Sequence, residues 1–143
     1  MVLLKPSPIP LTMVICDTVI DDKKTGKKSL IGLFNNINAE KAPFVHSRVN
    51  VFICLTEGVG DYVGKLRCVN MNDEKILFEM NGNVHFTNPH QVVEFDFELC
   101  GLSFPEFGEY RFELLCNDKL VIARKFKITE MHKPSKPDLQ KSE

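Results

Sequence analysis

The stretch Glu106-Phe107-Gly108-Glu109-Tyr110-Arg111-Phe112 decides the fold of this 143-residue chain. Gly108 suits a tight corner, because a residue without a Cβ tolerates backbone angles that other residues avoid. The side chain of Tyr110 can fold back from the following strand, so that its hydroxyl bonds to the backbone of the preceding loop. We therefore predict a structural corner made by Gly108, Tyr110 and Phe112 at the start of a β-strand.

This run resembles the acidic-x-Gly-x-Tyr-x-Cys sequence that opens the sixth strand of immunoglobulin domains, with Phe112 in place of the cysteine. The resemblance covers residues 104–128, and it implies the tyrosine corner of a β-sandwich. The chain differs from antibody domains because it has no tryptophan and no matched cysteine pair. The fold implied by the resemblance is an all-β, immunoglobulin-like antiparallel β-sandwich without a disulfide.

The order of motifs is also similar to that of small uncharacterised bacterial β-sandwich proteins. The matching elements are Cys16-Asp17 in the first strand, a Thr25-Gly26-Lys27 turn, residues 30–34 and residues 108–112. Proteins of this type have no known activity. The resemblance therefore implies a fold, and it assigns no catalytic or binding residue.

Apolar residues alternate with polar ones along most of the chain, which is the period of β-strands. The cleanest alternation runs over residues 93–99, where odd positions are apolar and even positions are acidic. In the strand near residues 75–86 we expect Ile76, Phe78 and Met80 to point inward. The pattern predicts eight strands, near residues 11–20, 29–37, 45–56, 62–71, 75–86, 93–99, 110–116 and 120–128.

The chain divides into one domain with two short ends. Residues 11–130 contain the predicted strands and form the sandwich. Residues 1–10 are rich in proline and predict an extended arm. Residues 131–143 are polar and carry little to bury, so we expect a flexible tail.

Composition narrows the class of protein. The chain is 43% hydrophobic with a formal net charge of -1, which favours one globular domain and gives no electrostatic reason to expect a nucleic acid or a membrane as partner. The first ten residues lack the apolar run of a secretory signal. The odd number of cysteines favours reduced, mostly buried thiols and a cytoplasmic location. They are Cys16, Cys54, Cys68, Cys100 and Cys116.

Residues 24–29, Lys-Thr-Gly-Lys-Lys-Ser, superficially resemble part of a nucleotide-binding loop. A Walker A loop requires a second glycine upstream and a helix downstream. Here that glycine is missing and a predicted strand follows. We interpret residues 23–28 as the solvated tip of a hairpin, with anion binding by its lysines as the alternative.

Catalytic, cofactor and metal sites are not predicted. The histidines do not fall at spacings typical of metal ligands, although the two that flank one turn can approach each other. All five cysteines lie in predicted strands, and Cys100, beside Gly101 at a strand end, is the candidate for an accessible thiol. The histidines are His46, His85, His90 and His132.

Glu94, Asp96 and Glu98 form an acidic strip on one face of a predicted strand. A solvated sheet face explains them, and a surface that meets a basic partner is the alternative. Their charge can also be neutralised within the chain. The cations considered for this are Lys65 and Arg67, or Lys125 and Lys127.

Three further residues are candidates for partner contact. Arg124 shares the inward phase of Phe126 and Ile128 on the last strand. An inward charge on an edge strand discourages aggregation, and an ion pair or a partner contact are the alternatives. Phe104 and Phe107 either cap one end of the sandwich or form an apolar recognition patch.

Three classes of function follow, in order of preference. The first is a non-enzymatic module for protein–protein contact, as a homodimer or an accessory subunit. The second is a sandwich that binds a small ligand, either a lipid or a carbohydrate. The absence of tryptophan weakens the carbohydrate version, because sugar platforms use exposed aromatic rings. The third is an enzyme that gathers groups from distant strands.

Overall fold

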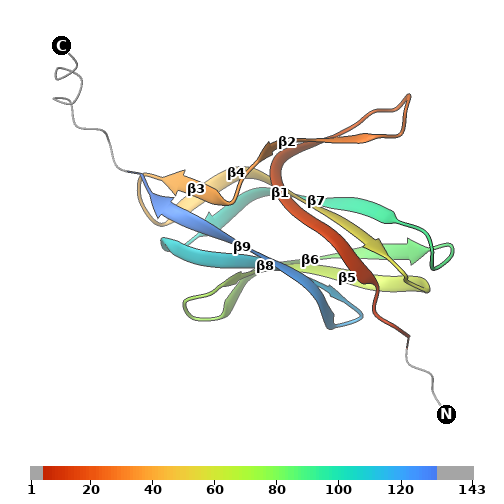
Figure 1. Ribbon diagram of the computed structural model, residues 1–143. Coiled ribbons are helices and arrows are strands. Elements are labelled where there is room, and N and C mark those ends of the chain that lie inside the picture. Colours follow the sequence, from red (N-terminus) through yellow and green to blue (C-terminus); the bar gives the residue numbers. More distant parts are fainter. Residues whose placement is uncertain (1–4, 132–143) are drawn as a thin grey trace.

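The computed structural model describes residues 5–131. Over this part of the chain, nine strands form two stacked sheets (Figure 1). The start of the predicted arm and the tail from residue 132 onward lie outside the described residues. The strands are β1 (Ile9–Asp21), β2 (Lys28–Leu33), β3 (Asn36–Ala39), β4 (Phe44–Thr56), β5 (Gly60–Asn70), β6 (Lys75–Phe86), β7 (Val93–Phe104), β8 (Gly108–Cys116) and β9 (Lys119–Glu130).

The strand order is that of an immunoglobulin-like sandwich. One sheet has the order β2-β1-β4-β7 and the other the order β3-β9-β8-β5-β6. Neighbouring strands are antiparallel, except that β3 runs parallel to β9. In immunoglobulin domains the second and fifth main strands share one sheet, and the third, sixth and seventh share the other. Here β4 and β7 take the first two places, and β5, β8 and β9 take the other three.

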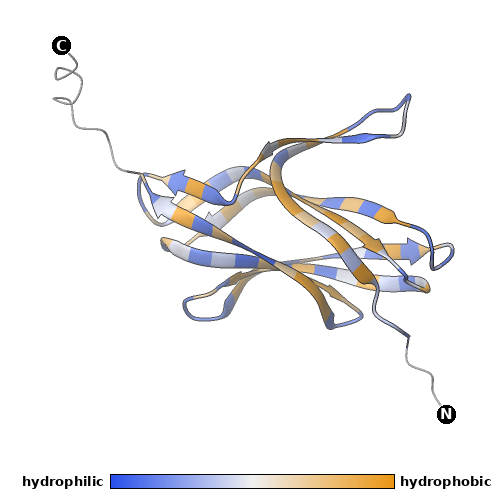
Figure 2. Cartoon of the chain, viewed as in Figure 1, coloured by the Kyte–Doolittle hydropathy of each residue, from blue (hydrophilic) through white to orange (hydrophobic). Residues whose placement is uncertain are grey.

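This topology confirms the predicted fold class. All five cysteines have free thiols, so the sandwich has no disulfide. Within residues 5–131 there is no helix long and apolar enough to cross a membrane. Figure 2 shows hydrophobic and hydrophilic residues alternating along the strands, as half-buried strands require.

The core lies between the sheets and is rich in aromatic rings. The ring of Phe112 stacks on that of Phe126 at a centroid distance of 4.9 Å, and Tyr110 stacks on Phe126 at 5.8 Å. Phe104 meets Tyr110 edge-on at 5.0 Å. Burial of each such side chain contributes about 2 kcal/mol to the free energy of folding. Phe112, which stands where the immunoglobulin run has a cysteine, is thus buried in this aromatic core.

The predicted strand over residues 29–37 is in fact two strands in different sheets. β2 pairs with β1, and β3 pairs with β9. Between them the amide of Phe34 donates to the carbonyl of Ile15 in one sheet, whereas the carbonyl of Asn35 accepts from the amide of Lys127 in the other. The crossing falls at the polar pair Asn35-Asn36, which does not by itself distinguish a change of sheet from an exposed stretch of one strand. The sequence pattern therefore gave eight strands where the structure has nine.

The inward orientation expected for the first half of β6 is also wrong in part. A bulge in the β5–β6 pairing sets Ile76 opposite Val69, on the outer face, and leaves Ile76 48% exposed. Phe78 and Met80 face inward opposite Cys68 and Leu66. They remain partly exposed because β6 is the edge strand of its sheet.

Candidate functional site

The predicted corner at the start of β8 is present and structural. The hydroxyl of Tyr110 donates to the carbonyl of Glu106 at 2.6 Å, and the amide of Glu106 donates back to that hydroxyl at 3.3 Å. The carboxylate of Glu106 accepts from the side chains of Asn70 and Asn72. Gly108 has a φ of 135°, which side-chain-bearing residues rarely adopt. The corner fixes the loop that joins the two sheets.

The two phenylalanines before this corner have different positions. Phe104 is fully buried, with its ring 5.8 Å from that of Phe126. It belongs to the core, and the interpretation of Phe104 as part of a surface recognition patch is wrong. Phe107 is half-buried and packs against the core, and its exposed part borders a shallow hollow with Met71 and Glu109.

The side chain of Arg124 forms a hydrogen bond that links the two sheets. One guanidinium nitrogen, Nη1, donates to the carbonyl of Met13 on β1 at 2.7 Å, and Nη2 donates to the side chain of Asn35. β9 lies between β3 and β8, and β3 covers it only from Lys127 onward. At Arg124 β9 is therefore an edge, as the sequence predicted, and the inward charge also satisfies a carbonyl of the opposite sheet.

The acidic strip lies on the outer face of β7, beside the outer face of β4. Glu98 forms an ion pair with Arg48 at 3.0 Å. Burial raises the pKa of Asp96, nearby Lys28 opposes that rise, and the charges of Asp21 and Glu98 add to it. The strip is therefore neutralised only in part.

The cations proposed from the sequence as partners of the strip lie elsewhere. Lys65 pairs with Asp118 at 3.5 Å, and Arg67 pairs with Glu113 at 2.6 Å. Both belong to the other sheet, as do Lys125 and Lys127 on β9. This assignment was wrong because sequence distance does not indicate which sheet a strand joins.

On the outer face of that second sheet, Glu113 is buried between two arginines. Its two carboxylate oxygens each accept from one Nε, from Arg67 and from Arg111, both at 2.6 Å. Arg111 in turn holds Glu74 through two bonds of 2.8 and 3.1 Å. Burial would raise the pKa of Glu113, but the bonds from the two arginines outweigh it and lower the pKa. The network is satisfied within itself and serves stability.

The β1–β2 hairpin projects beyond the sandwich (Figure 1). Its tip is closed by the amide of Asp22 donating to the carbonyl of Lys27 and the amide of Gly26 donating to the carbonyl of Asp22, both at 2.8 Å. The Asp22 carboxylate accepts from the amides of Lys24 and Thr25. The tip thus holds one conformation through its own bonds.

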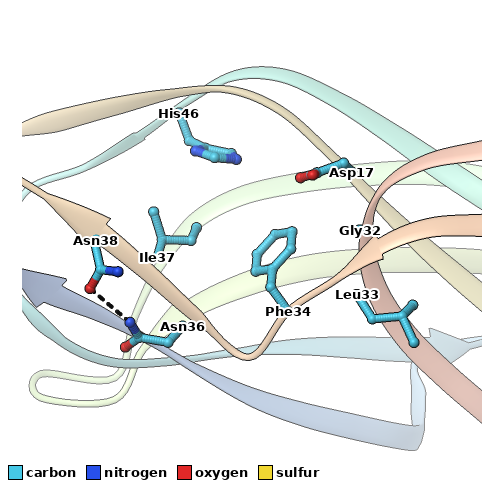
Figure 3. Close-up of a pocket in the computed structure, with 8 residues that line it drawn as sticks. All are labelled: Asp17, Gly32, Leu33, Phe34, Asn36, Ile37, Asn38 and His46. Atoms are coloured by element: carbon cyan, nitrogen blue, oxygen red, sulfur yellow. Dashed lines mark hydrogen bonds between the residues drawn. The ribbon is translucent and has the colours of Figure 1, made fainter.

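A cleft of about 380 Å³ opens where the chain crosses between the sheets (Figure 3). Its lining comes from four segments that are distant or differently paired: β1, the end of β2 with the crossing, β3, and β4. The ring of Phe34, the carboxylate of Asp17 and the imidazole of His46 lie around this space, whereas the side chains of Asn36 and Asn38 point away from it on the opposite face of β3 (Figure 3). The lining residues are Asp17, Gly32, Leu33, Phe34, Asn36, Ile37, Asn38 and His46. No sequence motif marks this cleft, because a crossover between the sheets brings its residues together.

The titratable side chains of His85 and His90 lie outside this cleft. Nδ1 of His85 is 2.6 Å from a carboxylate oxygen of Asp61, and both side chains are mostly exposed on facing strands. Nδ1 of His90 lies 4.0 Å from Glu57. Among residues 5–131 no three His, Cys, Asp or Glu side chains are arranged to hold a metal ion.

Comparison with known proteins gives a family and a structural likeness. The model of the Family of unknown function (DUF6941) matches residues 11–129. The chain is also similar to the crystal structure of an immunoglobulin-like protein (PA1606) from Pseudomonas aeruginosa, at 12% identity and a TM-score of 0.42. That likeness covers 86% of this chain and 97% of the other. A search of curated proteins finds no match.

Proposed function

This chain belongs to that family of unknown function, and we propose that it is a non-enzymatic interaction module that forms a two-fold homodimer through its β1–β2 hairpin. The observation that carries the proposal is one of charge. The hairpin tip presents lysines without ion-pair partners, and the outer face of β7 presents carboxylates in excess of cations. The same chain therefore carries two surfaces of opposite sign.

The hairpin tip is a preorganised cationic surface. Lys23, Lys24 and Lys27 are exposed, and none of them forms an ion pair within residues 5–131. The bonds around Asp22 and the positive φ of Gly26 fix the backbone between them. A surface that is ordered before binding loses little conformational entropy when a partner docks.

The face that receives the tip is acidic. Three carboxylates on this face, Glu94, Asp96 and Glu98, are matched by one ion-paired cation, Arg48. Glu94 and Asp96 have no ion-pair partner within 4 Å among the described residues, although Lys28, which pairs with Asp21 on the hairpin, lies close enough to influence both.

Apolar contact accompanies these charges. Ile20, Ile31 and Leu33 lie on the same side of the hairpin as the outer sheet face, because their cross-strand partners are Ser29, Thr18 and Cys16. All three are exposed, and Leu33 reaches 64%. β2 is also an edge strand with unpaired backbone groups. Apolar area would supply affinity, while the charges would set register and encounter rate.

A second copy of the chain fits these surfaces because two-fold symmetry is reciprocal. In an isologous dimer a contact between two different patches occurs twice, once in each direction. The lysine tip of each protomer would then lie on the acidic strip of the other. Tip and strip would both be neutralised in a single interface.

The test is sedimentation equilibrium of the full chain at low and high salt. We expect a dimer at low salt. The dimer should weaken as salt rises, because dissolved ions screen the attraction between tip and strip, with a Debye length of about 10 Å at about 0.1 M. The triple variant Lys23→Glu, Lys24→Glu, Lys27→Glu should raise the dimer dissociation constant at least about tenfold. Adding Glu94→Lys and Glu98→Lys to a second chain should restore pairing with that variant.

A matched control separates a specific contact from net charge. The triple variant Lys41→Glu, Lys75→Glu, Lys119→Glu makes the same change of charge at exposed lysines away from the tip. It should dimerise like the parent chain. Equal weakening by both triple variants, or a monomer at every concentration and salt, would overturn the proposal.

A further inference from the structure

We propose that the cleft of Figure 3 is a binding site for a small polyhydroxylated molecule of about the size of a monosaccharide. This inference is independent of the homodimer. It rests on the polar groups that converge on the cleft, on its aromatic wall and on its size.

Two polar side chains at the cleft have unused hydrogen-bonding capacity. The exposed Asp17 carboxylate and the half-buried His46 imidazole form no side-chain hydrogen bond or ion pair within residues 5–131. Asn36 and Asn38 point away from them on the opposite face of β3, where Asn36 donates to Asn38 at 3.0 Å (Figure 3). The open groups are thus an acceptor and a ring that can donate or accept. Vicinal hydroxyls, each both donor and acceptor, match this pair.

An apolar wall completes the site. The half-buried ring of Phe34 lies 6.0 Å from the ring of His46, at an interplanar angle of 57°. Ile37 is buried and forms part of the lining. The C–H face of a sugar ring packs on aromatic and aliphatic surface while its hydroxyls reach outward. A lipid chain would instead leave the two open polar groups unpaired, at a cost to binding.

Gly32 keeps the carboxylate at the cleft. Its φ is +75°, and a Cβ placed on it would collide with the carboxylate of Asp17. The backbone of β2 can therefore approach Asp17 only without a side chain. The cleft volume of about 380 Å³ lies within the usual range of small-ligand sites, roughly 300–1,000 Å³.

The test is a two-dimensional amide NMR titration of the full chain in high salt, where the proposed dimer dissociates. The probes are D-glucose, D-galactose, D-mannose and N-acetyl-D-glucosamine, with choline as a cationic comparison. We expect saturable shifts confined to the cleft for at least one sugar, at a dissociation constant in the millimolar range. Repeating it with the methyl glycoside of that sugar distinguishes a free sugar from the end of a longer glycan.

Variants decide whether the named residues bind. Asp17→Asn and His46→Ala should each weaken binding about tenfold or more, while Asn81→Ala, an exposed asparagine on β6, should leave it unchanged. The amide spectra report directly whether each variant is folded. The proposal is overturned by no shift with any of the sugars at tens of millimolar, by shifts outside the cleft, or by tighter binding of choline.

Discussion

The guanidinium of Arg124 on β9 donates to the carbonyl oxygen of Met13 on β1 at 2.7 Å, so that one side chain joins the two sheets. The two residues are 111 positions apart. The same guanidinium also reaches Asn35, at the point where the chain crosses from one sheet to the other. Arg124 thus fixes the crossing and the edge of the core together.

We expect Arg124→Met to lower the free energy of unfolding by roughly 2 kcal/mol, because charged hydrogen bonds of this kind contribute about that much. Urea denaturation measures it. Lys125→Met, which removes an exposed charge from the same strand, serves as control and should have little effect. Equal midpoints for the two variants would show that the hydrogen bonds of Arg124 contribute nothing to the free energy of unfolding.

Tyr110→Phe should lower the free energy of unfolding by roughly 1 kcal/mol. The substitution removes the bond to the carbonyl of Glu106 and the bond from its amide, and it preserves the ring that packs on Phe126. Denaturation in urea gives the difference. An unchanged midpoint would mean that water replaces the hydroxyl without loss and that the corner is not a source of stability.

The corner and the sandwich were predictable because their signals are local. A glycine and a tyrosine two residues apart carry the corner, and period-two alternation carries the strands. Phe112 was placed correctly in the core for the same reason. None of these features depends on which strand lies beside which.

The predictions that were wrong concern contacts that depend on which strands pair with each other. Within residues 29–37 only the polar pair Asn35-Asn36 separates β2 from β3, and this pair does not indicate that the chain changes sheets. The cations of the acidic strip are Arg48 and Lys28, which reach it only because β4 borders β7 and the hairpin lies near it. The cleft combines Asp17, Phe34 and His46 through the same crossing. Register and sheet order decide these contacts, and a single sequence does not encode them in any local pattern.

Glu113→Gln should destabilise the protein by roughly 2 kcal/mol at pH 7, because an amide satisfies only one of the two arginines that flank this buried carboxylate. The loss should depend on pH. Burial opposes ionisation of Glu113, and the bonds from Arg67 and Arg111 outweigh it, so the folded-state pKa is lowered. Stability from this group is therefore complete above the unfolded pKa of about 4.3 and disappears as pH falls through the lower folded value.

Urea denaturation of parent and variant between pH 7 and the acid limit checks this dependence. The difference between the two should be constant near neutrality and shrink once the pH drops below about 4. Glu109→Gln, at an exposed position of the same strand, should show no such difference. A gap between parent and Glu113→Gln that persists into strong acid would contradict the ionic origin of the effect.

In the native protein, Cys100 should be the one thiol that reacts rapidly with a maleimide. It is exposed on β7, whereas the other four cysteines are buried. Burial also raises the pKa of Cys68 to about 12 and that of Cys116 to about 11, which removes the reactive thiolate near neutral pH.

Mass spectrometry should find one label per native chain and five after denaturation. Cys100→Ser should abolish the native label, and Cys54→Ser should preserve it. Fast labelling of the Cys100→Ser chain would mean that the strands around a buried cysteine open readily, contrary to the packing of the core.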